Sequence, residues 1–330
     1  MRSLTALTST LTGLALAGAM ALTLASCAGP NRSETDTITA PGPNEGLPYT
    51  IDLPTSQGSW VPEVSHRGRI PAEGATIDIE RLGTFSFEAS EVETTRPDIF
   101  RPGHFSVFDV LVHLSERGEI DLEYHFDEGM NTHVIDAING EPHWWYEARY
   151  SQGWFETNVF RMDMYPFKDG TDIRVFTRDE DYMDRVYRTF AAEVERLGAN
   201  NGEVVIPRVV INGPLTDLVF ENVTVTPHDT RPDILAPGVV TALDILLSLG
   251  EQGSLESVGL TWYDRIAGAD PVDGYWVERI NADQASGGCG FVYETGPEEF
   301  RGFAGSHIHI PLDVRVIVSP EYALWFWICL

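Results

Sequence analysis

Apolar and polar residues along this chain fall into two stretches that predict the same order of elements. Alternating apolar positions predict strands, and apolar positions three and four residues apart predict helices. In the first stretch, strands are expected at 75–82 and 84–89, a helix after Ser106, and strands at 133–138, 144–150 and 172–177. In the second, strands are expected at 205–211 and 218–226, a helix after Thr241, and strands at 275–281, 291–294 and 313–319. This order predicts the α+β class, with a helix packed across a mixed sheet in each stretch.

The two stretches contain an internal duplication. The nonapeptide TRPDIFRPG recurs 135 residues later as TRPDILAPG, and 12 of the 26 residues in 95–120 are identical in 230–255. Such self-similarity indicates two copies of one supersecondary unit. We interpret the nonapeptide as a turn that precedes a helix. Arg96 and Arg231 are expected to pair with local carboxylates, with ligand contact as the alternative.

Capping signals fix both ends of the two predicted helices. Ser106 with Asp109, and Thr241 with Asp244, have the spacing of a capping box at the start of a helix. Gly118 and Gly253 follow the last apolar positions, where glycine commonly ends a helix.

Two further segments have their own patterns. Residues 181–197 are amphipathic with helical period and predict a helix between the copies. Asn139-Gly140 is a hairpin-turn signal. The apolar end, 322–330, follows a good helix start at Ser319-Pro320-Glu321. It is expected to be a final core helix or strand, a tail facing a partner or membrane, or the cut end of a longer chain.

Four segments of the first copy resemble the transcobalamin C-terminal-like family: SVFDVL, THVIDAING, WWYEARYSQGW and PFKDGTDIRV. The second copy keeps TALDIL, YWVERIN, GFVYETG and PLDVRV. The resemblance covers about 71–319 and implies a β-grasp fold in each copy and the general role of a ligand-binding module. In vitamin-binding members, this module covers a cobalamin held by a separate helical barrel, for which this chain has no room.

The expected organisation is two tandem β-grasp-like domains after a signal peptide and a flexible tether. The boundaries are a signal peptide at 1–26, a tether at 27–70, a first repeat at 71–178, a linking helix at 179–204 and a second repeat at 205–330.

The N-terminus predicts export and lipid anchoring. Arg2 precedes an apolar run, and Leu24-Ala25-Ser26-Cys27 resembles the lipobox of bacterial lipoproteins, in which the cysteine is lipidated. Acyl chains on Cys27 would hold the protein on a membrane without a transmembrane helix. The alternative is an ordinary signal peptide that contains a cysteine.

Composition narrows the classes of partner. The net charge is −28, with Lys168 as the single lysine, which argues against nucleic acid and against electrostatic docking on anionic lipid. Three cysteines occur, so Cys289 and Cys329 are left to form a disulfide if Cys27 is lipidated. Sequence alone does not decide that pairing.

Aromatic residues supply the candidate ligand site. They cluster at 143–155, and a strand there would place alternate side chains on opposite faces, one of them open to a planar or sugar-like ligand. The alternative is that these rings pack in the core. The candidate ligand-binding residues are His143, Trp145, Tyr150, Trp154 and Trp262, together with the cleft between the copies.

Histidines give a weaker hypothesis of a metal site. His125 and His133 lie near acidic residues, and His307 and His309 would share one face of a strand. No spacing matches a known ligand motif. The sequence names no cofactor and carries no nucleophile elbow, Cys–His pair or phosphate loop, so we expect no enzyme. The expected function is binding of a small soluble ligand or an envelope protein, with a structural lipoprotein or an acidic metal-binding protein as alternatives.

Overall fold

The structure is a computed structural model that describes residues 49–51, 75–150, 155–156, 160–168, 171–263, 273–302 and 311–329. All of these residues belong to one unit, Ile38–Leu330. Within it, mixed sheets and few helices place the protein in the α+β class, as the hydrophobic pattern predicted.

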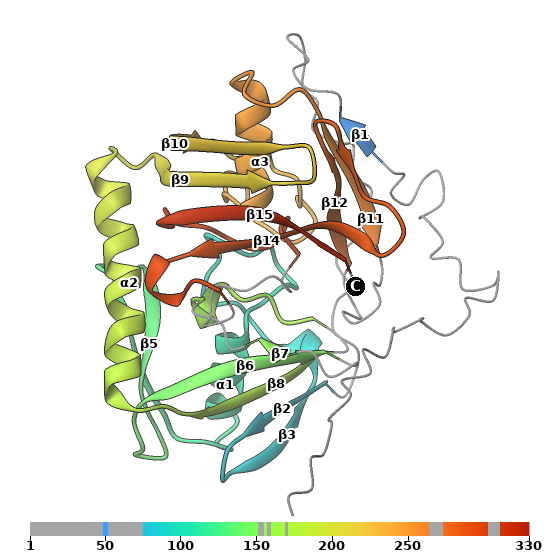
Figure 1. Ribbon diagram of the computed structural model, residues 1–330. Helices are drawn as coiled ribbons and strands as arrows, with labels where there is room; N and C mark the ends of the chain where they lie inside the picture. The colour runs from blue at the N-terminus through green and yellow to red at the C-terminus, as the bar shows by residue number, and fades with distance from the viewer. Residues whose placement is uncertain are drawn as a thin grey trace, which may run out of the picture. The chain divides into compact units, whose positions relative to one another are not determined.

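The first repeat contains a five-stranded mixed sheet in the order β3-β2-β8-β6-β7 (Figure 1). Strand β2 pairs in parallel with β8, and the other neighbours are antiparallel. The first and last strands of the repeat therefore lie side by side at the centre of the sheet. The bounds are β2 Ala75–Ile79, β3 Gly83–Phe87, β6 Trp144–Tyr150, β7 Phe155–Glu156 and β8 Thr171–Thr177.

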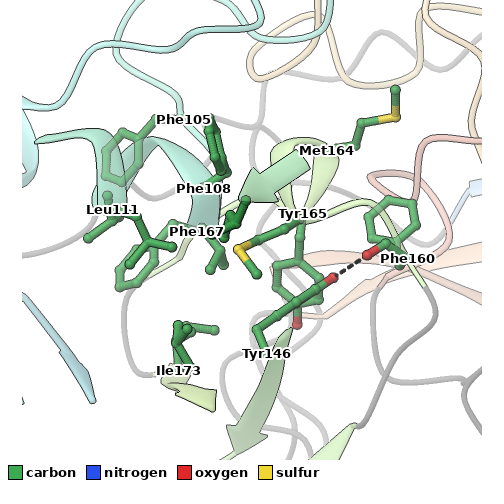
Figure 2. Packing of buried hydrophobic residues seen from close by; sticks show 14 of the residues in the cluster. Phe105, Phe108, Leu111, Tyr146, Phe160, Met164, Tyr165, Phe167 and Ile173 are labelled. Atoms are coloured by element: carbon green, nitrogen blue, oxygen red, sulfur yellow. Dashed lines mark hydrogen bonds between the residues drawn. The ribbon is translucent and has the colours of Figure 1, made fainter. Parts of the chain in front are cut away.

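Helix α1 (Val107–Glu116) begins and ends as predicted. Ser106 and Asp109 form a capping box, and Gly118 follows the helix with a φ of 72°, a conformation that glycine adopts without strain. The buried face of α1 packs against residues of β6 and β8 in one core cluster (Figure 2). In the same cluster, Tyr146 donates a hydrogen bond of 3.0 Å to the carbonyl of Phe160.

A separate hairpin follows α1. Strands β4 (Leu122–Asp127) and β5 (Thr132–Ile138) pair only with each other among the strands of the described chain. Asn139 and Gly140 do form a turn, with φ angles of 52° and 77°. Ile138 and Glu141 form an antiparallel bridge across this turn, but the pairing goes no further, because β5 pairs with β4 and the chain then enters the larger sheet as β6.

The second repeat has the same sheet order, β10-β9-β15-β14, with β15 parallel to β9 (Figure 1). Its bounds are β9 Val204–Asn212, β10 Asp217–Val225, β14 Cys289–Gly296 and β15 Tyr322–Cys329. The apolar end of the chain is therefore the central strand β15 of this sheet. The expectation of a core helix or strand at this end of the chain is thus met by a strand.

Helix α3 (Ala242–Glu251) repeats the capping box of α1 with Thr241 and Asp244. A second hairpin, β11 (Val258–Tyr263) and β12 (Gly274–Ile280), follows it. This hairpin is widened into a four-stranded sheet in the order β1-β11-β12-β13. The added strands are β1 Tyr49–Ile51 and β13 Asp283–Gln284. The stretch 49–51 was expected to be flexible tether, but it pairs antiparallel with β11.

The expected strand at 313–319 was wrong. Phe167 N–H donates to the carbonyl of Phe105 at 2.9 Å, and Ile317 N–H donates to Val240 at 2.9 Å. Since Val240 lies 135 residues after Phe105, Ile317 corresponds to Phe167. The segment around Ile317 is thus the connection before the last strand. Added length in the second repeat moves that last strand to 322–329, so a constant offset fails after α3.

Helix α2 (Glu180–Ala199) connects the repeats, close to the predicted 181–197. Asp179 caps it, and Met183, Val186 and Phe190 on its buried face join the first core cluster. Three short 3₁₀ helices complete the described elements: η1 Ala89–Glu91, η2 Met162–Met164 and η3 Glu298–Phe300.

The two nonapeptides contact each other. Phe100 and Leu235 form an antiparallel bridge, and these are equivalent residues in the duplication. Arg101 N–H donates to Ile234 at 2.9 Å, and Ala236 N–H donates to Ile99 at 2.8 Å. Equivalent groups thus exchange hydrogen bonds, as in a local two-fold contact. One function of the repeated stretch is to join the repeats.

Candidate binding surface

Two of the aromatic residues expected at the ligand site are core residues. Trp145 is 3% exposed and packs against Phe190 of α2 with ring centroids 6.2 Å apart, and Trp262 is 2% exposed. Neither offers a ring face to a ligand, which corrects the expectation of an exposed platform at these positions. The cause is that Phe190 of α2 packs on Trp145, and Tyr275 of β12 packs on Trp262. His143 is half-buried before β6, with a φ of 67°. The Tyr150 side chain and Trp154 lie outside the described residues.

The exposed aromatic side chains lie instead on the first hairpin. Tyr124 and Phe126 of β4 are 41% and 44% exposed. They are two residues apart in a strand, so they share one face of the hairpin. Sequence reasoning missed them. The available signal was the alternation of aromatic and polar residues in Tyr-His-Phe-Asp.

His133 of β5 completes this surface. It lies directly across from Phe126, with ring centroids 5.0 Å apart, and 5.9 Å from the ring of Tyr124. Its other side stacks on Phe108 of α1, with centroids 4.8 Å apart and rings inclined by 14°. The hairpin surface, defined here as Tyr124, Phe126 and His133, is thus held against the core through His133 and through Tyr124, whose ring lies 5.2 Å from that of Phe108.

Asp163 of η2 stabilises the hairpin surface from its buried side. This carboxylate accepts hydrogen bonds from the backbone N–H of His133 at 3.0 Å and from the Thr132 hydroxyl at 2.6 Å. It also lies 3.0 Å from Nδ1 of His133 and 2.8 Å from the guanidinium of Arg96. Burial acts to raise the pKa of Asp163, but the hydrogen bond to His133 and the charge of Arg96 outweigh it and lower that pKa. Asp163 is therefore a stable buried anion.

Arg96, the arginine of the first nonapeptide, links this support to the surface. Its Nε and NH2 atoms bind the two carboxylate oxygens of Asp98 at 2.9 and 2.7 Å. Its guanidinium lies over the ring of Phe126, 5.5 Å from the centroid, within cation–π range. The expected pairing of Arg96 with local carboxylates is confirmed.

The second repeat contains the same support. Arg231 pairs with Asp233 at 2.9 Å and with Asp313 at 3.0 Å, and Asp313 also accepts from the N–H of Tyr275 at 3.2 Å. Arg231 lies 5.0 Å from the ring centroid of Trp262, and that ring packs on Tyr275 at 5.3 Å. The pairing predicted for Arg231 is confirmed as well.

The histidines proposed as metal ligands are not brought together. His125 lies next to Phe126 on β4, so it points to the hairpin face opposite His133. Its Nδ1 lies 2.9 Å from Asp136, whereas His133 lies against Asp163. No group of three His, Cys, Asp or Glu side chains that could hold a metal occurs among the described residues. His307 and His309 lie outside them.

The junction of the repeats contains a hollow lined by Arg101 and residues of the second nonapeptide. Its charged lining residues already have partners: Arg231 binds two carboxylates, Arg101 donates to the carbonyl of Leu235 at 3.2 Å, and Asp229 accepts from the N–H of Gly238 at 2.9 Å. We therefore place the candidate site on the hairpin surface and not in the cleft expected between the copies.

The two cysteines left after Cys27 form a disulfide. Cys289 and Cys329 are cross-strand neighbours in β14 and β15, and their sulfurs are bonded. The bridge therefore links the edge strand β14 to its neighbour β15 in the second repeat.

Within the described part of the chain, no helix is both long and apolar enough to cross a membrane. Comparisons with protein-family models, curated proteins and solved structures found no match to this chain.

Proposed function

We propose that this chain is an exported, lipid-anchored protein that binds a partner protein at the cell envelope through its hairpin surface. The observation that carries the proposal is the exposure of Tyr124 and Phe126, at 41% and 44%. Large aromatic side chains that stay exposed on an ordered support are typical of interaction sites. The support here is the buried Arg96–Asp163 pair.

A partner protein fits this surface better than a small molecule. Small ligands are usually enclosed in a concave, largely apolar pocket. Tyr124 and Phe126 instead project from a two-stranded hairpin, and the large rings that could have walled a pocket, Trp145 and Trp262, are buried. An exposed pair of rings on a strand offers contact area to another protein.

The strand order supports the β-grasp assignment suggested by the sequence. In both repeats, the first strand lies beside the last in parallel, and this pair lies between β3 and β6 in the first repeat and between β10 and β14 in the second. The helix follows the first two strands in both cases. This arrangement is the one expected of a β-grasp module, and with it the resemblance to the transcobalamin C-terminal-like family remains our proposal.

Site-specific photo-crosslinking in the native host tests the partner. A photoreactive amino acid replaces Tyr124 in one version of the chain and Leu82, which is 36% exposed in the turn between β2 and β3, in a control version. We expect a discrete protein adduct from position 124 and none from position 82. Adducts of equal yield at both positions, or none at 124, would count against the proposal.

Lipid anchoring is tested separately. The motif Leu24-Ala25-Ser26-Cys27 carries this part of the proposal. Cys27→Ser should abolish incorporation of labelled palmitate and release the chain from the membrane fraction. If C27S stays in the membrane fraction, the anchor lies elsewhere.

A further inference from the structure

The two hairpins correspond residue by residue. Each carries a register shift at the same place, between Glu123 and Tyr124 in β4 and between Gly259 and Leu260 in β11. Each is closed by an equivalent asparagine whose side chain accepts a backbone N–H, Asn139 from Asp121 at 2.7 Å and Asn281 from Ser257 at 3.2 Å. Tyr124 therefore corresponds to Leu260, and Phe126 to Trp262.

The outer edge of the second hairpin is occupied. Strand β1 pairs antiparallel with β11, with Tyr49 opposite Leu260, Thr50 opposite Gly259 and Ile51 opposite Val258. In the first hairpin, no described strand pairs with the outer edge of β4. An unpaired edge presents backbone N–H and C=O groups that another strand can bind.

The exposed fractions of equivalent side chains differ between the two hairpins, as the pairing of their outer edges does. Leu260 and Trp262 are 1% and 2% exposed, whereas their equivalents Tyr124 and Phe126 are 41% and 44% exposed. The protein thus covers this surface in one repeat and leaves it open in the other. Strands β3 and β10 show no such contrast, because both end their sheets in the described chain.

We propose that the outer edge of β4 binds an extended segment of the partner protein as an added antiparallel strand. The geometry is that of β1 on β11, whose register reaches the equivalent of Tyr124, extended by two residues so that apolar side chains of the segment lie on Tyr124 and Phe126. Strand addition of this kind draws affinity from backbone hydrogen bonds and specificity from alternate side chains. This inference rests on the proposed function and specifies how the partner binds.

Charge identifies the kind of segment. Residues 119–138 contain six Asp and Glu residues and no Lys or Arg. The whole chain carries a net charge of −28, so a second copy would be repelled. The edge therefore suits a segment in which apolar and β-branched residues alternate, flanked by Lys or Arg.

A peptide of that composition tests the inference. The probe is a fluorescent nonapeptide with two lysines at each end and Thr-Tyr-Thr-Ile-Thr between them, titrated into the full-length chain in detergent. The matched control peptide is N-methylated at the central threonine, which removes one backbone donor and keeps every side chain. We expect saturable binding of the first peptide and binding weaker by about tenfold for the second, since about 1.4 kcal/mol corresponds to a factor of ten.

Variants of the protein locate the binding edge. F126S should weaken the first peptide by about tenfold, because it removes an aromatic contact at the site. Val219→Ser, at a residue 51% exposed on β10, should leave binding unchanged. Equal binding of the two peptides, no saturable binding, or loss with V219S and not with F126S would each overturn strand addition at β4. The comparison of the two peptides needs only the wild-type chain, so it does not depend on the folding of a variant.

Two further results separate this inference from the proposed function. A cross-linked partner at position 124, with peptides that bind equally, would leave the function standing and overturn strand addition. A dimer that F126S dissociates would assign the edge to a second copy and overturn the basic partner segment. Absence of both the adduct and peptide binding would overturn the function together with the inference.

Discussion

The hairpins of the two repeats are stabilised by the same kind of arginine–aspartate pair. They differ in whether the aromatic ring beside that pair is exposed or buried. In both, an arginine of the nonapeptide binds a buried aspartate and lies over an aromatic ring of the first hairpin strand. In the first repeat that ring is Phe126, which is 44% exposed, and in the second it is Trp262, which is 2% exposed. The duplication has kept the internal framework while the outer surface has diverged.

This contrast separates structure from candidate function within one chain. The nonapeptides are nearly identical because each supplies the arginine and the contact between the repeats. By contrast, Leu122–Asp127 and Val258–Tyr263 have no identical residue at corresponding positions. The residues that distinguish an open surface from a covered one therefore lie in the hairpins.

The largest expected loss of stability comes from replacing Arg231. Arg231→Ala would leave Asp313, whose side chain is 0% exposed, as a buried carboxylate without its arginine. Breaking a buried pair in this way costs about 3–5 kcal/mol of unfolding free energy. Arg96→Ala should cost less, about 1.5–3 kcal/mol, because Asp163 keeps its bonds to Thr132 and His133. Denaturant unfolding followed by tryptophan fluorescence measures both.

The double variant R231M/D313L is the control for this prediction. It removes the charges of Arg231 and Asp313 and should recover part of the loss, because apolar residues of similar size can replace a buried pair, whereas Asp233, whose side chain is 10% exposed, loses its arginine in both variants. A loss below about 1 kcal/mol for R231A would show that the pair does not support the second hairpin.

Replacing Trp262 and Phe126 by alanine tests directly whether the two rings differ in burial. Trp262→Ala should cost about 3–5 kcal/mol, since it opens a cavity in the core. Phe126→Ala should change stability by less than about 1 kcal/mol, because nearly half of the side chain is already in water. Thermal or denaturant unfolding of the two variants side by side measures the difference. Equal costs would mean that Phe126 is as well covered as Trp262.

Removing the disulfide should lower stability by a smaller amount, and only in the second repeat. Replacing Cys289 and Cys329 by serine should cost about 2–4 kcal/mol, because the bridge restricts a loop with a sequence separation of 40 residues in the unfolded chain. The equivalent strands of the first repeat, β6 and β8, contain no cysteine. Hydrogen exchange should therefore increase in β14 and β15 and stay unchanged in β6 and β8. Uniform loss of protection would mean that the repeats unfold as one.

Sequence reasoning was most accurate where the signals are local. The capping boxes of α1 and α3 and the amphipathic α2 depend on residues within a few positions of one another, and all three helices lie where they were expected. Strand β15 was harder, because eight consecutive apolar residues carry neither the helical nor the strand period. Its role depends on β9, more than a hundred residues earlier in the chain, with which it pairs.

The candidate site was misplaced for the same reason. Trp145 and Phe126 are both aromatic residues in strands that follow α1, and the local alternation that indicates a strand does not show which ring distant elements cover. Helix α2 buries Trp145, and the outer edge of β4, next to Phe126, has no described partner strand. Coverage by distant elements is a tertiary property, so it could not be derived from the spacing of residues.

The smallest expected effect is a pH dependence that belongs to the second repeat alone. His228 is buried, with Nδ1 2.9 Å from Asp244 and Nε2 3.3 Å from Glu251, whereas the corresponding residue of the first repeat is Glu93. Burial acts to lower the pKa of His228, but the hydrogen bond and charge of Asp244, with the charge of Glu251, raise it above its ordinary value of 6.5.

A raised pKa in the folded state means that the folded protein binds the proton more tightly than the unfolded chain does. The stability contributed by protonated His228 is therefore fully present below pH 6.5 and is lost as pH rises through the folded-state pKa. We expect the unfolding free energy to decline over that window in the wild type and to be flatter in His228→Gln, with Glu251→Gln intermediate because Asp244 remains. A profile of His228→Gln that declines more steeply than the wild type there would show that burial, and not the two carboxylates, dominates at His228.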